Sequence, residues 1–348
     1  MSEPLKPCFV AELVADSTIT SVFLVHRKDL RQKKDGDNYL SLTLGDRTGQ
    51  IDANMWDRVA EVQNSFERDD FIRVRGVVKL YREKPQLTIE RLRRVEERDV
   101  QLADYLPATT ADVGAMFAEL LERVASVQNP HLRALLQAIF QDPDIARRYQ
   151  IAPAAKALHH AYLGGLLEHV TSLCRLGELV LRNYPFVDRD LLLTGILLHD
   201  LGKIEELSYQ RSFAYTTSGQ LLGHMVIVLE LLHRKLAALP DFPHALQTLV
   251  EHLIISHHGQ YAFGSPKLPM FPEALLLHQL DDMDSKMQAM HTQLQQEAPT
   301  NAEWTAFNRS LERPLLRTER WLAAGAGRAD AGAAANTESA NPLPGLGQ

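Results

Sequence analysis

The hydrophobic pattern changes its period once along the chain, near residue 110, and this change separates two kinds of structure. Between residues 18 and 94 apolar and polar residues alternate, as they do in half-buried strands. In Tyr39–Leu44, for example, the leucines occupy one face and Tyr39 lies on the other. From Ala111 to Leu322 the apolar residues recur with helical spacing instead. We therefore expect an all-β domain followed by an all-α domain, which suits 348 residues at about 100–200 per domain.

The β half is predicted to be a small closed barrel. After the turn Gly45–Gly49 we expect strands at Gln50–Trp56, Phe71–Tyr81 and Pro85–Val95, which makes about five in all. Five short strands are enough for a small Greek-key barrel. The predicted boundaries are 10–98 for the barrel, 99–110 for a linker, 111–322 for the helical domain and 323–348 for a small-residue tail expected to be disordered.

Composition excludes several classes of protein. No apolar run approaches the ~20 residues that span a bilayer, and the N-terminal residues do not resemble a signal peptide. Cys8 and Cys174 are the two cysteines, so we expect no disulfide framework and a cytoplasmic location. The net charge of −7 argues against a strongly basic nucleic-acid binder but leaves a local basic groove open.

One buried helix is predicted to end in a histidine and an aspartate. Leu191–Leu198 is apolar nearly all round, which indicates a helix inside the bundle. His199 and Asp200 follow it, and a buried carboxylate must be paired, hydrogen-bonded or bound to metal. Lys203 could be the partner of Asp200, so this dipeptide alone does not distinguish an ion pair from a metal site.

Further potential ligands are spaced by about one helix plus a loop. The chain has 14 histidines, and all of them except His26 and His131 fall between residues 159 and 291. The potential ligands beside His199 and Asp200 are His169, His224, His257, His258 and Asp281. Five helices of one bundle could bring them to a common centre. A set without cysteine favours Mn, Fe or Mg-like chemistry, leaves zinc possible and excludes a cysteine-type structural zinc site.

The motifs around these residues resemble those of the YhaM-type 3′–5′ exoribonucleases, which are HD-domain metal-dependent phosphohydrolases. They are LHDLGKIEE at 198–206, GQLLGH at 219–224, HHG at 257–259 and LHQLDDMDSKM at 277–287. The resemblance covers roughly residues 10–315 and is more specific in the helical half. It implies an N-terminal OB-fold barrel followed by an HD-domain helical bundle. After His258 the sequence GQYAFGSP differs from the GYP signature of cyclic-dinucleotide phosphodiesterases. The residues LGK after Asp200 lack the extra acidic pair of guanosine-tetraphosphate hydrolases.

The resemblance also implies the roles of individual residues. The metal ligands would be His169, His199, Asp200, His224, His257 or His258 or both, and Asp281. Asp200 would bridge two divalent ions, with Mn²⁺ favoured and Fe, Co or Mg as alternatives. Lys203 would contact the substrate phosphate. The implied reaction is hydrolysis of single-stranded RNA from its 3′ end to nucleoside monophosphates, with single-stranded DNA as a second substrate.

The barrel offers a potential nucleic-acid surface. Arg73, Arg75, Lys79 and Tyr81 lie on the polar face of one strand, and Tyr39 lies on the polar face of another. Cationic tracks with aromatic side chains are typical of single-strand binders, whereas the competing interpretation is an ordinary solvated strand. Two rival functions remain open: an HD phosphohydrolase of a small nucleotide whose barrel serves assembly, and a non-catalytic nucleic-acid-binding regulator. No membrane partner is expected, and the oligomeric state is not predicted.

Overall fold

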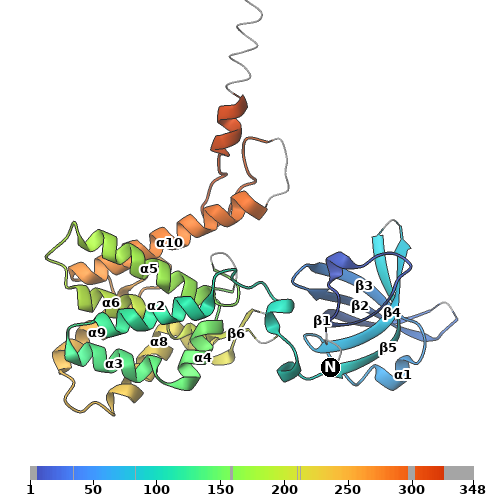
Figure 1. The fold of residues 1–348 in the computed structure, drawn as a ribbon, viewed down its shortest axis with the longest axis horizontal. Helices are drawn as coiled ribbons and strands as arrows, with labels where there is room; N and C mark the ends of the chain where they lie inside the picture. Colours follow the sequence, from blue (N-terminus) through green and yellow to red (C-terminus); the bar gives the residue numbers. More distant parts are fainter. Residues whose placement is uncertain are drawn as a thin grey trace, which may run out of the picture. The chain divides into compact units, whose positions relative to one another are not determined.

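The computed structural model describes residues 6–33, 35–82, 84–156, 160–209, 211, 213–296 and 302–324. The described residues up to 282 form one compact unit, which contains a β-barrel and a bundle of helices, and the described residues from 283 onward belong to a second (Figure 1). The predicted order of an all-β domain followed by an all-α domain is confirmed. Within the described residues no helix is both long and apolar enough to cross a membrane.

The barrel closes in the strand order β1-β2-β3-β5-β4. Its strands are β1 (Thr18–Gln32), β2 (Asn38–Asp46), β3 (Gly49–Met55), β4 (Phe71–Tyr81) and β5 (Lys84–Val95). Neighbouring strands are antiparallel except β3 and β5, which run parallel. The short helix α1 (Val59–Val62) lies between β3 and β4.

Alternation along the strands explains the barrel core. Leu40, Leu42 and Leu44 of β2 are fully buried, and they pack in one cluster with Phe23 of β1 and Val74 of β4. Their sequence neighbours on β2 point outward, as the period of two requires. The predicted linker, residues 99–110, is partly packed: the ring of Tyr105 meets that of Phe71 edge to face at 4.8 Å.

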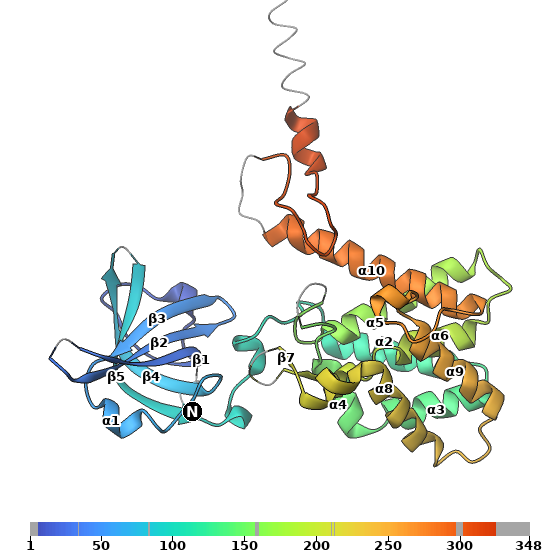
Figure 2. The same ribbon diagram turned by 180° about the vertical axis from the view of Figure 1, so that it is seen from behind.

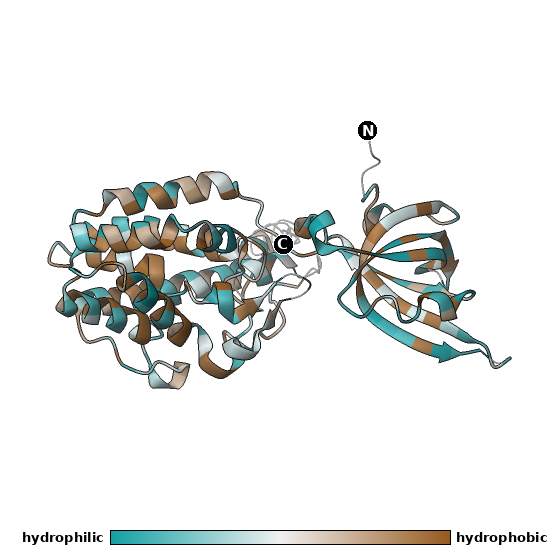
Figure 3. Ribbon diagram, turned by 90° about the horizontal axis from the view of Figure 1, so that it is seen from below, coloured by the Kyte–Doolittle hydropathy of each residue, from teal (hydrophilic) through white to brown (hydrophobic). Residues whose placement is uncertain are grey.

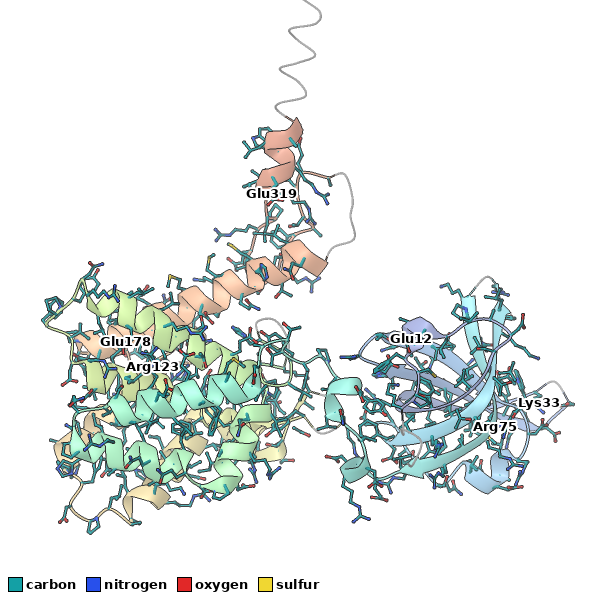
Figure 4. The ribbon with its side chains drawn as sticks, in the orientation of Figure 1. Glu12, Lys33, Arg75, Arg123, Glu178 and Glu319 are labelled. Atoms are coloured by element: carbon teal, nitrogen blue, oxygen red, sulfur yellow. The ribbon has the colours of Figure 1, made fainter. Side chains whose placement is uncertain are left out.

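The bundle is built around α6 (Arg189–Leu198), from Asp190 onward buried on every side as its apolar sequence predicted. The other helices are α2 (Val113–Ser126), α3 (Pro130–Phe140), α4 (Pro143–Ile151), α5 (Gly165–Leu181), α7 (Lys203–Glu206), α8 (Thr217–Leu236), α9 (His244–Ser256) and α10 (Pro272–Gln296), and β6 (Leu207–Ser208) pairs with β7 (Ala214–Tyr215) (Figure 2). Brown, apolar residues are frequent along these helices in Figure 3, and the buried ones pack in one core cluster. Ion pairs tie neighbouring helices at their surface, as between Arg123 and Glu178, labelled in Figure 4.

Helix α4 has a polar sequence that buries only Ile145 and Tyr149. Helix α5 begins at Gly165. One local prediction differs from the structure. Helical structure was expected up to Leu322, but residues 302–317 form turns and isolated bridges, such as that between Trp304 and Leu316. The disordered tail predicted for 323–348 lies outside the described residues from 325 onward.

Candidate metal centre

Five helices bring the predicted ligands to one place in the bundle. His169 lies in the second turn of α5, and His199 with Asp200 follows the last turn of α6. Helix α8 supplies His224, and α10 supplies Asp281. His257 and His258 lie at the end of α9. Apart from His258 and Asp281, these side chains are almost completely buried. The helices that the sequence spacing suggested could share a centre do meet here, and that their side chains bind metal stays a prediction.

The side chains divide into two groups. In one group the nearest ligand atoms of His169, His199 and Asp281 lie within 4.8 Å of one another. In the other, the same holds for His224, His257 and His258. Each group could hold one metal ion, and both histidines at the end of α9 belong to the second.

Asp200 lies between the two groups and turns one oxygen toward each. Its Oδ2 is 3.4 Å from His199 Nε2 and 3.9 Å from His169 Nε2. Its Oδ1 is 3.5 Å from His224 Nε2 and 3.7 Å from His257 Nε2. A carboxylate placed in this way can bridge two cations.

Hydrogen bonds donated by Nδ1 orient four of the histidines. The acceptors are the Ile196 carbonyl for His199, at 2.9 Å, and the Ile254 carbonyl for His257, at 2.6 Å. They are the Phe263 carbonyl for His258, at 2.9 Å, and the Glu206 carboxylate for His224, at 3.2 Å. When Nδ1 donates its proton, a neutral imidazole presents a bare Nε2, which is the form that binds metal.

Burial keeps two of these rings neutral. It lowers the pKa of His257 well below its usual value, and the nearby His199 lowers it further. Burial and His224 together lower the pKa of His258. His257 Nε2 faces His224 Nε2 at 3.4 Å, so two lone pairs converge. Such an arrangement is stabilised by a cation.

The carboxylates stay ionised although they are buried. Burial alone would raise the pKa of Asp200, but Lys203 and His199 lower it well below the ordinary range. The Lys203 ammonium donates a hydrogen bond of 2.6 Å to Asp200 Oδ2. Burial likewise opposes ionisation of Asp281, whereas a hydrogen bond with His169 and the proximity of His199 hold its pKa low. The ion pair that the sequence left open is therefore present.

The donors fit a divalent cation. His199 Nε2 and Asp200 Oδ1 are buried, and neither has a hydrogen-bond partner among the described residues. A buried polar atom without a partner is costly, and coordination to a metal removes that cost. Imidazole and carboxylate donors without sulfur suit Mn, Fe and Zn.

Glu206 is a participant that the sequence analysis missed. One oxygen, Oε1, accepts from both the backbone N–H of His224, at 3.0 Å, and its ring. Gly223 makes this possible, because its φ of 73° interrupts α8 immediately before His224. Glycine adopts a backbone conformation with positive φ at little cost, whereas other residues do so at a higher cost. The only sequence signal is that Glu206 closes the LHDLGKIEE motif.

Three other histidines have structural surroundings that their spacing did not reveal. His160 is buried in the left-handed conformation (φ 48°), its ring centroid 5.5 Å from that of His169. His278 donates a hydrogen bond from Nδ1 to the backbone oxygen of His257, at 3.0 Å. His252 accepts from the Met270 N–H at 3.1 Å.

The predicted nucleic-acid residues lie on two parts of the barrel. Tyr39, near the start of β2, stacks on Trp56, with ring centroids 4.5 Å apart and planes at 22°. Trp56 was not predicted as a nucleic-acid-binding residue. In the β2–β3 register Leu40 faces Met55, so Trp56, the residue after Met55, lies beside Tyr39. The Trp56 side chain is 40% exposed, so this pair is open to solvent on one side.

The other four residues lie on β4. We call Arg73, Arg75 and Lys79 the β4 basic row; Tyr81 ends the strand (Figure 4 labels Arg75). In the β4–β5 register Arg73 lies opposite Arg93, and Arg75 lies opposite Arg91. The row therefore belongs to a wider basic surface, which Glu90 partly neutralises through its ion pair with Arg75 at 3.5 Å.

Comparisons with known proteins identify both modules. The family described as "OB-fold nucleic acid binding domain" matches residues 24–95, and the family described as "HD domain" matches residues 166–286. The chain therefore joins an OB-fold barrel to an HD domain. Among curated proteins, "3'-5' exoribonuclease YhaM" of Geobacillus sp. (strain WCH70) is 33% identical over 285 residues, 81% of this chain and 87% of the relative.

Other relatives carry the same name. The protein from Bacillus subtilis (strain 168) is 34% identical over 81% of this chain and 90% of its own length. The protein from Shouchella clausii (strain KSM-K16) is 35% identical over 75% of this chain and 81% of its own length. The chain belongs to the YhaM 3′–5′ exoribonuclease family.

Proposed function

We propose that this protein is a metal-dependent 3′–5′ exoribonuclease that hydrolyses single-stranded RNA to nucleoside monophosphates. The observation that carries the proposal is the position of Asp200, with one carboxylate oxygen directed at each of two histidine groups. Family membership supports the reaction and its direction. Single-stranded DNA is proposed as a second substrate and the cytoplasm as the location.

The proposed ligands of the first ion are His169, His199 and Asp281, and those of the second are His224, His257 and His258. Asp200 is proposed to bridge the two ions. Mn²⁺ is favoured, with Fe, Co or Mg as alternatives. Bound divalent ions would supply an activated water and would offset charge on the attacking and leaving oxygens.

Two residues of the chain are proposed to act on the reacting groups. The Asp200 carboxylate, kept ionised by Lys203, would provide the negative charge that holds the ions. The Lys203 side chain is 14% exposed, more than the Asp200 side chain with which it pairs. It is proposed to donate hydrogen bonds to the phosphoryl oxygens as their charge increases in the transition state.

The barrel is proposed to hold the RNA. The β4 basic row would contact phosphates, and Tyr39 and Tyr81 would stack on bases. Trp56 strengthens the case for Tyr39, because the two rings already form a flat, partly exposed platform.

A single assay tests the proposal. The metal-loaded protein is incubated with RNA labelled at its 5′ end, with the same RNA blocked at its 3′ end, and with small nucleotides. Successive shortening of the free RNA, release of monophosphates and protection by the block are expected. Hydrolysis of a small nucleotide alone would instead support the rival phosphohydrolase function, and binding of RNA without hydrolysis would support the regulator.

A further inference from the structure

The loop between α9 and α10 combines two metal-centre residues with exposed aromatic rings. It starts with His257 and His258, continues through the short 3₁₀ helix η4 (Tyr261–Phe263) and reaches α10 at Pro272. The side chains of Tyr261 and Phe263 are 64% and 54% exposed. Large aromatic rings are normally at least half buried, so two on one short turn need an explanation.

The loop is held firmly by hydrogen bonds. The Ser265 hydroxyl is buried and bonds to the Lys267 carbonyl at 2.7 Å and the Ile255 carbonyl at 3.2 Å. Its far end is fixed by the bond from the Met270 N–H to His252 at 3.1 Å. The exposed rings therefore stand on a rigid support, which lowers the entropy lost when a ligand binds them.

The same turn contacts the metal centre directly. The backbone carbonyl of Phe263 accepts the Nδ1 hydrogen bond that orients His258. Gly259 permits the close approach, because it has a φ of +74° and a Cβ there would lie 2.3 Å from the His278 ring. The backbone of the turn thus serves the centre, while its side chains face outward.

The chemistry of the loop suits a nucleobase. Residues 259–271 contain no carboxylate, and their single charged residue is Lys267, in a chain of net charge −7. Within the described part of the chain neither Tyr261 nor Phe263 stacks on another aromatic ring, and more than half of each residue is exposed. Stacking on a base is tolerant of sequence, because every base has a flat face.

We propose that Tyr261 and Phe263 form a stacking platform for the bases at the 3′ end of the RNA. Stacking there would hold the last phosphodiester beside the metal centre whatever the base. The proposal rests on the proposed exoribonuclease function. It assigns these rings to substrate binding and gives them no part in holding metal.

The test compares alanine variants on RNA with and without terminal bases. Tyr261→Ala, Phe263→Ala and the double variant keep the Phe263 backbone carbonyl, so bound metal and the hydrolysis of bis(nitrophenyl) phosphate should match the wild type. On a short RNA we expect KM to rise by roughly 5- to 150-fold, the range that corresponds to one stacked base. Phe263→Tyr and Tyr261→Phe should restore most of the wild-type KM.

Base-free substrates isolate the interaction. For the wild type, RNA whose last two residues lack bases should show a similarly raised KM. For the double alanine variant, removal of those bases should add little, because the stacking partner is already absent. The matched control is Phe186→Ala, which removes a ring that is 71% exposed in the loop between α5 and α6. It should leave KM unchanged.

Several results would overturn the proposal. If the alanine variants bind RNA with wild-type KM, the rings serve another contact, such as a protein surface. If metal content falls in parallel with activity, the turn acts only through His258. If the wild-type protein shortens RNA but is insensitive to the missing bases, the stacking platform fails while the exoribonuclease function stands. A wild-type protein without activity on RNA would remove both.

Discussion

Replacing Asp200 by asparagine separates the two tasks that this residue is proposed to perform. The carboxylate bridges the two histidine groups and also neutralises Lys203 through a contact of 2.6 Å. Asparagine keeps the shape and one oxygen acceptor but removes the charge. We expect bound metal to fall from two ions to less than one per chain. The rate on RNA should fall by about 10²–10³-fold or more, as when an electrostatic group is removed from an active site.

The effect on stability follows from Lys203. Breaking a buried ion pair by removing one partner costs about 3–5 kcal/mol, because the other charge stays buried. The Lys203 side chain is 14% exposed, and the asparagine oxygen can still accept a hydrogen bond from its ammonium group. We therefore take the lower end of this range, about 3 kcal/mol. For a domain of this size each kcal/mol changes Tm by about 2–4 °C, so the metal-free variant should melt roughly 6–12 °C lower.

A second substitution distinguishes the two effects. Lys203→Met in the Asp200→Asn background removes the unpaired cation and should recover most of the lost Tm without recovering metal or activity. Lys203→Met alone should lower kcat while bound metal stays near two ions per chain. Asp190→Asn is the matched control. This buried carboxylate of α6 accepts hydrogen bonds from two backbone N–H groups, each of 2.7 Å, and is not one of the proposed ligands. Its loss should lower Tm but should not change the amount of bound metal.

The measurements are elemental analysis, initial rates on labelled RNA and helical melting by circular dichroism at 222 nm. The assignment of Asp200 as the bridge is wrong if Asp200→Asn retains two ions and the wild-type rate. If Lys203→Met loses metal in proportion to activity, Lys203 is a structural partner of Asp200 and does not act on the phosphate. Recovery of activity in the double variant would show that the charge at Asp200 is dispensable.

Three further predictions concern the surroundings of the centre and the barrel. Glu206→Gln removes the charged acceptor of His224 and should weaken metal binding about 10- to 100-fold in a metal titration, whereas Glu205→Gln, on the exposed side of the same helix, should not. Burial lowers the pKa of His257 and His258, so below about pH 6.5 the unfolded chain takes up protons that the folded protein does not. The free energy of unfolding of the metal-free protein should therefore fall between pH 7.5 and pH 5.5, by up to about 1.4 kcal/mol per pH unit for each histidine. Its Tm should be lower at pH 5.5, and an unchanged Tm would contradict this. Replacement of the three residues of the β4 basic row by serine should raise KM for long RNA and leave hydrolysis of a small ester unchanged. The slope of log affinity against log salt should fall by about 2, at ~0.7 per phosphate contact. A wild-type KM across the salt series would instead make the row an ordinary solvated face.

The sequence was sufficient to predict which side chains meet, because residue type and spacing can be read directly from it; that these side chains bind metal stays a prediction. The order of His169, His199, His224, His257 and Asp281 along five helices predicts a common centre wherever those helices pack. What spacing could not predict is the direction of each ring. The carbonyls of Ile196 and Ile254 hold two of the rings, and every residue has a carbonyl, so no residue type indicates them.

The barrel half shows why charge counting along one strand is too weak an argument. A row of alternating basic residues is the usual outcome for a solvated strand, and the net charge of −7 speaks against a polyanion partner. The register changes that balance, because Arg73 and Arg75 lie directly opposite Arg93 and Arg91. Like charges in facing positions destabilise a sheet, and neutral residues would serve the fold better at these positions. Two such pairs side by side are therefore explained more readily by an anionic ligand than by folding, and this reason comes from pairing across strands that the sequence of β4 does not contain.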